Sequence, residues 1–144
     1  MSFQTKNPNF QQLISNKLEG QFFMKHNRFE LTKVEEGRIV SELQINQIHL
    51  QQDGILHGGA ISTLCDVAMG FAAFSLVEED VKVVTSNLTV NFLKPNQASV
   101  FRVEAWVVKP GKHLFFCEAL GTNLQDNVWV ETVRASSSMA LVRE

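Results

Sequence analysis

Asp66 is the only formally charged residue between His57 and Val77, a segment that reads HGGAISTLCDVAMGFAAFSLV. A carboxylate in so apolar a setting loses its hydration, so it needs polar partners or a chemical role. The segment begins with His57-Gly58-Gly59, whose two glycines can present bare backbone N–H groups at the start of a helix. A thioester carbonyl needs little more than one carboxylate and N–H donors for the developing oxyanion, because thiolate is a good leaving group. The spacing therefore indicates acyl-transfer chemistry.

The separation of Gly58 from Asp66 has a consequence for assembly. Eight residues of helix at ~1.5 Å each place the two about 12 Å apart along the axis. A reacting carbonyl must lie about 3 Å from both the donor and the carboxylate. We therefore expect that one chain does not complete the site. Two antiparallel helices could do so, which predicts a homodimer in which Gly58 of one protomer meets Asp66 of the other.

The elements that must position these residues follow from apolar periodicity and turn signals. Asn7-Pro8 predicts the start of a helix that ends at Gly20, within an N-terminal segment 1–20. Alternating residues on both sides of Glu36-Gly37 predict a β-hairpin. A long helix is expected over about 59–77. The remaining pattern is that of four strands, at 81–93, 98–108, 113–121 and 128–142.

This order of elements predicts an α+β fold. Short turns make neighbouring strands antiparallel, and four long strands leave an apolar face large enough to wrap a helix that is hydrophobic nearly all round. We therefore place the 59–77 helix against the concave face of one curved antiparallel sheet. With 144 residues the chain is long enough for one core, so a single domain over 1–144 is expected.

Composition limits the classes of binding partner and the cellular compartment that are expected. A net charge of −2 gives no basic field for nucleic acid. Cys65 and Cys117 form no CxxC pair, which fits a reducing cytosol, and no signal peptide is evident at the N-terminus, so a cytoplasmic protein is expected. The polar residues inside the long apolar segment favour a core helix over a membrane span. The four histidines lack metal-ligand spacing, so no metal site is expected.

Two motifs resemble a known family. The pattern L-H-G-G-A-x(3)-L-x-D-x-A-x-G covers Leu56 to Gly70, and T-x(5)-N-F-L-K-P covers Thr85 to Pro95. Together they closely resemble the HotDog-fold acyl-CoA thioesterases, most of all the phenylacetate-pathway and 4-hydroxybenzoyl-CoA thioesterase type, from about Phe22 onward. The resemblance implies a long helix wrapped by an antiparallel sheet, dimers that often pair into tetramers, and an acyl-CoA substrate with no separate cofactor.

The resemblance also implies roles for individual residues around the motif. Asp66 falls where the family has its nucleophile or general base, and the residues leave these two roles open. Gly58 falls at the backbone N–H that polarises the thioester carbonyl. Independently of the resemblance, Gly58 and Gly59 both lack Cβ, so a substrate can approach closely. His57 is expected to hold that loop in place. Gln51 falls where relatives carry Gln or Asn near the carbonyl or the attacking water.

Further residues on the strand side complete this set. Thr85 falls where relatives use Ser or Thr beside the acid and its water. Ser86, on the opposite face of an ideal strand, competes with Thr85 for this role, as Gln52 competes with Gln51. Gly70 departs from the family, because some relatives place Thr or Ser one helical turn after the acid. The water-positioning role therefore depends more on Thr85.

Basic residues near two turns are candidates for the phosphates of coenzyme A. Lys94 precedes Pro95, and Lys109, Gly111 and Lys112 belong to the turn around Pro110. Arg102 and Arg134 are alternatives that the sequence does not rank. Phe71, Phe74 and Phe92 are expected in the core, where one or two could line an acyl pocket.

Two other functions fit the same fold. A hydroxyacyl-CoA dehydratase would need a His and an acid acting jointly on the acyl chain, usually at a different spacing. A non-catalytic acyl-CoA-binding module would be expected to lack the acid. The H-G-G amides and the lone Asp66 favour thioester hydrolysis over both.

Overall fold

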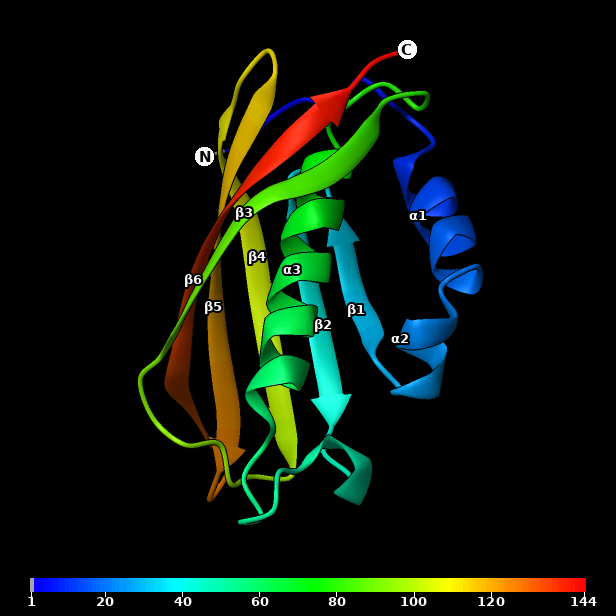
Figure 1. Cartoon of the computed structure of the whole chain (residues 1–144). Helices are drawn as coiled ribbons and strands as arrows, with labels where there is room; N and C mark the ends of the chain where they lie inside the picture. Colours follow the sequence, from blue (N-terminus) through cyan, green and yellow to red (C-terminus); the bar gives the residue numbers. More distant parts are fainter. Residues whose placement is uncertain (1) are drawn as a thin grey trace.

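The computed structural model describes residues 2–144, and its strands form one six-stranded sheet beside a long central helix (Figure 1). The strand order is β1-β2-β4-β5-β6-β3, and every neighbouring pair is antiparallel. The elements are α1 (Phe10–Glu19), α2 (Phe22–His26), β1 (Glu30–Glu35), β2 (Arg38–Gln44), the 3₁₀ turn η1 (Gln47–His49), α3 (Gly58–Phe74), β3 (Lys82–Phe92), β4 (Val100–Pro110), β5 (Leu114–Gln125) and β6 (Val128–Val142).

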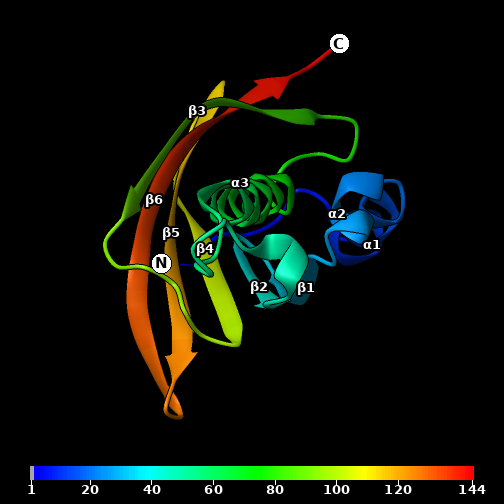
Figure 2. The same cartoon turned by 60° about the horizontal axis from the view of Figure 1, so that its bottom comes forward.

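The sheet curves around α3, which lies on its concave side (Figure 2). The predicted α+β arrangement, with one helix wrapped by an antiparallel sheet, is thereby confirmed. Most of α3 is buried because its sequence is apolar on nearly every side, from Ile61 to Phe74. One stripe stays half-buried, and its members are Ser62, Thr63, Asp66, Val67 and Gly70. The sheet therefore does not cover the stripe of α3 that contains Asp66.

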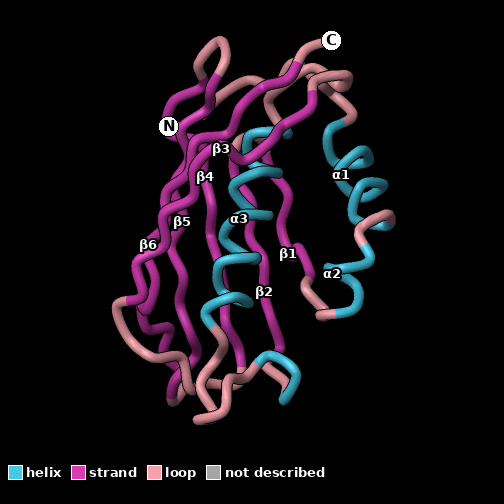
Figure 3. The backbone as a smooth tube through the Cα atoms, in the orientation of Figure 1, coloured by secondary structure: helices cyan, strands magenta, loops and turns pink. Residues whose placement is uncertain are grey.

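The β3 strand lies at one edge of the sheet (Figure 3). Its pairing with β6 is irregular at one point. Thr85 pairs with Met139 and Asn87 with Ser138, so Ser86 is an extra residue in the ladder, a β-bulge. Such an insertion reverses the alternation of faces along a strand. As a result Thr85 faces α3 on one side of the bulge, while Leu88 packs against the core on the other.

Three local expectations need correction. The first helix begins at Phe10 rather than at Pro8, because the Asn7 side chain is buried and its Oδ1 accepts a hydrogen bond from Asn9 N–H in a preceding turn. The short α2 was not expected, since five residues are too few for a helical period to be recognised. Phe92 is 53% exposed and is not a core residue, whereas Phe71 and Phe74 are buried as predicted.

Candidate active site

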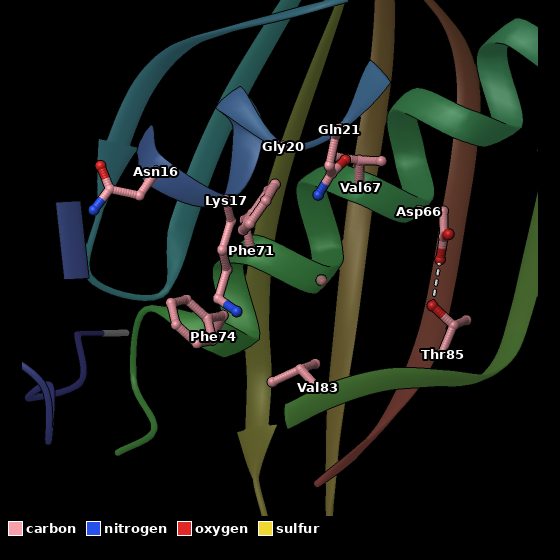
Figure 4. Close-up of a pocket in the computed structure, with 11 residues that line it drawn as sticks. Asn16, Lys17, Gly20, Gln21, Asp66, Val67, Phe71, Phe74, Val83 and Thr85 are labelled. Carbon is pink, nitrogen blue, oxygen red and sulfur yellow. Dashed lines mark hydrogen bonds between the residues drawn. The ribbon is translucent and has the colours of Figure 1, made fainter. Parts of the chain in front are cut away.

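Asp66 forms a short hydrogen bond with β3. The Thr85 hydroxyl donates to Asp66 Oδ1 at 2.6 Å, and no other side-chain hydrogen bond to this carboxylate occurs within residues 2–144 (Figure 4). That distance falls in the range of charge-assisted O–H···O⁻ bonds. One carboxylate oxygen is thus oriented by Thr85, while Oδ2 has no protein donor in the described chain. The carboxylate is half-buried rather than fully enclosed, so reactants can approach it.

Asp66 and Thr85 line a cavity of about 530 Å³. One wall is the half of α3 that follows Asp66, and a second is the start of β3. The remaining wall comes from the end of α1 and its junction with α2, at Lys17 and Gln21 (Figure 4). The N-terminal helices therefore help to enclose the space beside the acid, a role that the sequence did not indicate.

The N-terminus of α3 presents one free backbone donor. His57 is the N-cap, and its Nδ1 accepts a hydrogen bond from Gly59 N–H at 2.8 Å. A Cβ on Gly59 would lie 3.0 Å from that nitrogen, so glycine at this position permits the cap. Within the described chain Gly58 N–H has no acceptor, and its position at the positive end of the helix dipole suits a developing oxyanion. His57 thus caps the start of α3, and its role at the site stays a prediction.

Gly58 and Asp66 face different cavities of one protomer. Gly58 lines a second cavity of about 300 Å³ together with Phe92 and Lys94, whereas Asp66 lines the larger one. Eight residues of continuous helix separate them, about 12 Å along the axis. The structure of one chain thus keeps the acid and the free amide apart, as the spacing predicted.

A buried polar cluster holds the segment that precedes Gly58. Asn96 Oδ1 accepts hydrogen bonds from Asn123 Nδ2 at 2.9 Å and from Thr132 Oγ1 at 2.7 Å, and all three residues are buried. The Asn96 carbonyl then accepts from Leu56 N–H at 3.0 Å. Asn96 directly follows the N-F-L-K-P motif, but a polar residue after a proline reads as a loop, so sequence gave no sign of this role.

Of the residues predicted to lie beside Asp66, one contacts it and the others form hydrogen bonds elsewhere. Gln51 Oε1 accepts from Asp53 N–H, so this side chain orders its own turn, and it lines neither cavity. Gln52 is exposed and hydrogen-bonds Asp53 at 3.4 Å. Ser86 donates to the Ser138 carbonyl within the β3–β6 pair. Of the predicted acid partners, the structure brings Thr85 to Asp66.

The basic candidates lie at opposite ends of the protomer. Lys94 lines the cavity of Gly58, while Lys109 and Lys112 lie beside the β4–β5 turn, near the other end of α3 (Figure 1). Gly111 N–H donates to the Leu114 carbonyl at 3.0 Å, which closes that turn. The two arginine alternatives are engaged elsewhere, since Arg102 pairs with Glu42 and Arg134 with Glu131.

The two cysteine thiols are buried and stay protonated at neutral pH. Burial raises the pKa of Cys65 to about 12, with the nearby Asp66 charge as a smaller cause. Burial likewise raises the pKa of Cys117 to about 12. Within residues 2–144 no three His, Cys, Asp or Glu side chains form a group that could hold a metal ion. No helix in the same range is long and apolar enough to span a membrane.

Comparisons with known proteins converge on one family. A family model described as the thioesterase superfamily matches residues 53–141. The 1,4-dihydroxy-2-naphthoyl-CoA hydrolase of Listeria monocytogenes is 30% identical over 83 residues, which cover 58% of this chain and 68% of that protein. Four other curated relatives are named as putative esterases. The matched part of this chain covers 56% to 63% of their length.

Solved structures have the same fold over most of the chain. A thioesterase family protein from Silicibacter pomeroyi has a TM-score of 0.90 at 30% identity, covering 94% of this chain and 99% of that one. A hypothetical thioesterase protein from Streptococcus pneumoniae, solved with coenzyme A, has a TM-score of 0.70 at 25% identity, with coverages of 81% and 90%.

Proposed function

The chain belongs to the thioesterase superfamily, and from this membership we propose that it is an acyl-CoA thioesterase that releases a free acid and coenzyme A. The observation that carries the proposal is the Thr85–Asp66 hydrogen bond at the wall of a cavity large enough for an acyl group. Relatives named as a CoA hydrolase and as a thioesterase solved with coenzyme A support the substrate class.

Asp66 supplies the reacting carboxylate in this proposal. Thr85 holds Oδ1, which leaves Oδ2 to take a proton from water or to attack the carbonyl carbon directly. In the first route the hydroxide adds to the carbonyl, and the tetrahedral intermediate expels the thiolate, which takes up the proton. In the second route an acyl-aspartate anhydride forms, thiolate leaves, and water hydrolyses the anhydride. A thiol pKa of about 8.5 lets the leaving group depart without a strong general acid.

Gly58 N–H of a partner protomer stabilises the oxyanion. Three features of the described chain support a shared site: the free Gly58 N–H, its separation from Asp66, and the half-buried stripe of α3 on which Asp66 lies. Among residues 2–144 no strand pairs with the outer side of the edge strand β3, which exposes Val84, 52% accessible, and Phe92. In a homodimer with a two-fold axis and antiparallel α3 helices, Gly58 of one protomer could meet Asp66 of the other, and the partner could cover the exposed edge of β3. Pairing of dimers into tetramers, a single domain over 1–144 and a cytoplasmic location stay predictions.

Lys94 is the best placed basic residue for coenzyme A. It lines the same cavity as Gly58, whose N–H is proposed to bind the thioester oxygen, so a ligand held there would lie beside Lys94. Lys109 and Lys112 lie near the opposite end of α3, so in an antiparallel dimer the partner's copies of these residues would lie toward the end that contains Gly58.

A thiol-release assay across a panel of acyl-CoAs tests the proposal. Asp66→Asn keeps the shape of the side chain but removes the basic oxygen, and we expect it and Asp66→Ala to abolish release. Gly58→Pro removes the N–H while suiting the first position of a helix, and His57 already has the extended ψ of 134° that a following proline favours. Gly58→Ala is the matched control, because its Cβ would meet the Phe92 ring at an ordinary 3.5 Å. Hydration of enoyl-CoA without thiol release, or tight binding without turnover, would contradict the hydrolase assignment.

A further inference from the structure

The cavity beside Asp66 has an apolar floor that leads away from the carboxylate. Asp66, Gly70 and Phe74 follow one another at four-residue intervals, so they share one face of α3 over about 12 Å. A Cβ on Gly70 would meet no atom within 4 Å, which shows that the space above it is open. An acyl chain whose carbonyl lies at Asp66 can therefore run over Gly70 toward the ring of Phe74.

The far end of this path is positively charged. Lys17 extends from the last turn of α1 over the Phe74 ring, with Nζ 4.8 Å from the ring centroid (Figure 4). Within residues 2–144 no carboxylate lies within ion-pair distance of this ammonium group. Gln21 lines the same wall and adds a polar side chain, whereas Asn16, which also lines it, accepts a hydrogen bond from Gln12 through its Oδ1 at 2.9 Å. The aromatic face attracts the cation, but within residues 2–144 no protein acceptor binds the ammonium protons, which are therefore hydrated at this exposed residue.

These groups would interact differently with different acyl chain ends. A purely aliphatic chain end would displace water from Lys17 and from the amides without replacing their hydrogen bonds, which is unfavourable. A chain that ends in a carboxylate would pair with the ammonium group and still cover the apolar floor with its methylenes.

We propose that the cavity selects acyl-CoA substrates with a distal carboxylate, and that Lys17 is the residue that recognises this group. The inference rests on the proposed function in one respect: it takes the cavity at Asp66 as the place of the acyl group. It assigns a substrate-recognition role to α1, which precedes the segment matched by the family model.

The test compares adipoyl-CoA with hexanoyl-CoA, which have six carbons each and differ in the distal carboxylate. One charge-assisted hydrogen bond at a partly exposed site corresponds to about a tenfold preference for adipoyl-CoA in kcat/KM. Lys17→Met removes the charge at similar length and is expected to abolish this preference, mainly through KM for adipoyl-CoA. Lys25→Met is the matched control, since Lys25 pairs with Glu19 on the neighbouring helix and does not line the cavity.

The same comparison is repeated as a binding measurement. Dissociation constants of both thioesters for Asp66→Asn, with and without Lys17→Met, report recognition without turnover. A Lys17-dependent preference in binding supports the inference even if the wild type hydrolyses neither thioester, a result that would overturn the proposed function alone. If Lys17→Met leaves the preference for adipoyl-CoA unchanged, the inference is overturned. It is also overturned if Lys17→Met weakens the binding of both thioesters equally, since Lys17 would then contact the coenzyme A portion.

Discussion

The hydrogen bond from Thr85 to Asp66 should contribute to turnover rather than to folding. Thr85→Val replaces the hydroxyl by a methyl group of similar size, so packing on β3 is nearly preserved while the 2.6 Å bond is lost. A hydrogen bond to a charged group is worth about 1.5–3 kcal/mol, and solvent access at Thr85 places this one near the lower end. A barrier increase of about 1.5 kcal/mol corresponds to roughly a tenfold loss of kcat.

The assay is steady-state thiol release with a saturating acyl-CoA, run beside urea denaturation of the same variants. Thr85→Val is expected to lower kcat about tenfold. Its effect on the free energy of unfolding should stay below about 1 kcal/mol, because in the free protein water reaches the exposed Thr85 and can hydrogen-bond Asp66 in place of the hydroxyl, whereas bound substrate excludes that water. Thr85→Ser keeps the donor and should restore most of kcat. If Thr85→Val turns over as fast as the wild type, or if Thr85→Ser is equally impaired, the hydroxyl does not orient Asp66.

Three further variants and measurements test the structure around the site. Gly70→Ala should raise the free energy of unfolding by about 1 kcal/mol in urea titrations, because alanine favours a helix and the added methyl meets no atom within 4 Å; a decrease would contradict the open cavity. Asn96→Ala should lower it by about 2–4 kcal/mol, because the Asn123 amide and the Thr132 hydroxyl lose their buried acceptor, and a change under about 0.5 kcal/mol would contradict the cluster. The Cys65 thiol, with its pKa raised to about 12 by burial, is about 10⁻⁴ ionised at pH 8, so the folded protein should leave a disulfide reagent unreacted until urea is added.

The positions that carry the proposed chemistry could largely be predicted from local sequence. The glycine pair and the following apolar run specify a helix that begins near Gly58, and α3 spans Gly58–Phe74 against an expected 59–77. The turn at Glu36-Gly37 forms as predicted, with Gly37 at φ 72°. These features are local, because capping, turn conformation and periodicity depend on neighbouring residues alone.

The remaining features depend on contacts between distant segments. An ideal strand places Thr85 on the opposite face from Leu88, and only the bulge at Ser86 brings both toward α3. Such an insertion depends on the partner strand β6, so it leaves no local signal. The wall that Lys17 contributes and the cluster around Asn96 likewise join residues more than 25 positions apart. The roles proposed for Gln51, Lys109 and Lys112 stay predictions.

Subunit mixing tests the shared site most directly. Gly58→Pro and Asp66→Ala are purified separately, mixed under conditions that allow protomers to exchange, and assayed for thiol release. In a mixed dimer one site combines the intact Asp66 of the first variant with the intact Gly58 of the second. Because half of the dimers would be mixed and each has one complete site, recovery should approach about one quarter of wild-type activity. If the mixture stays as inactive as its components although exchange has occurred, the acid and the amide do not come from different protomers.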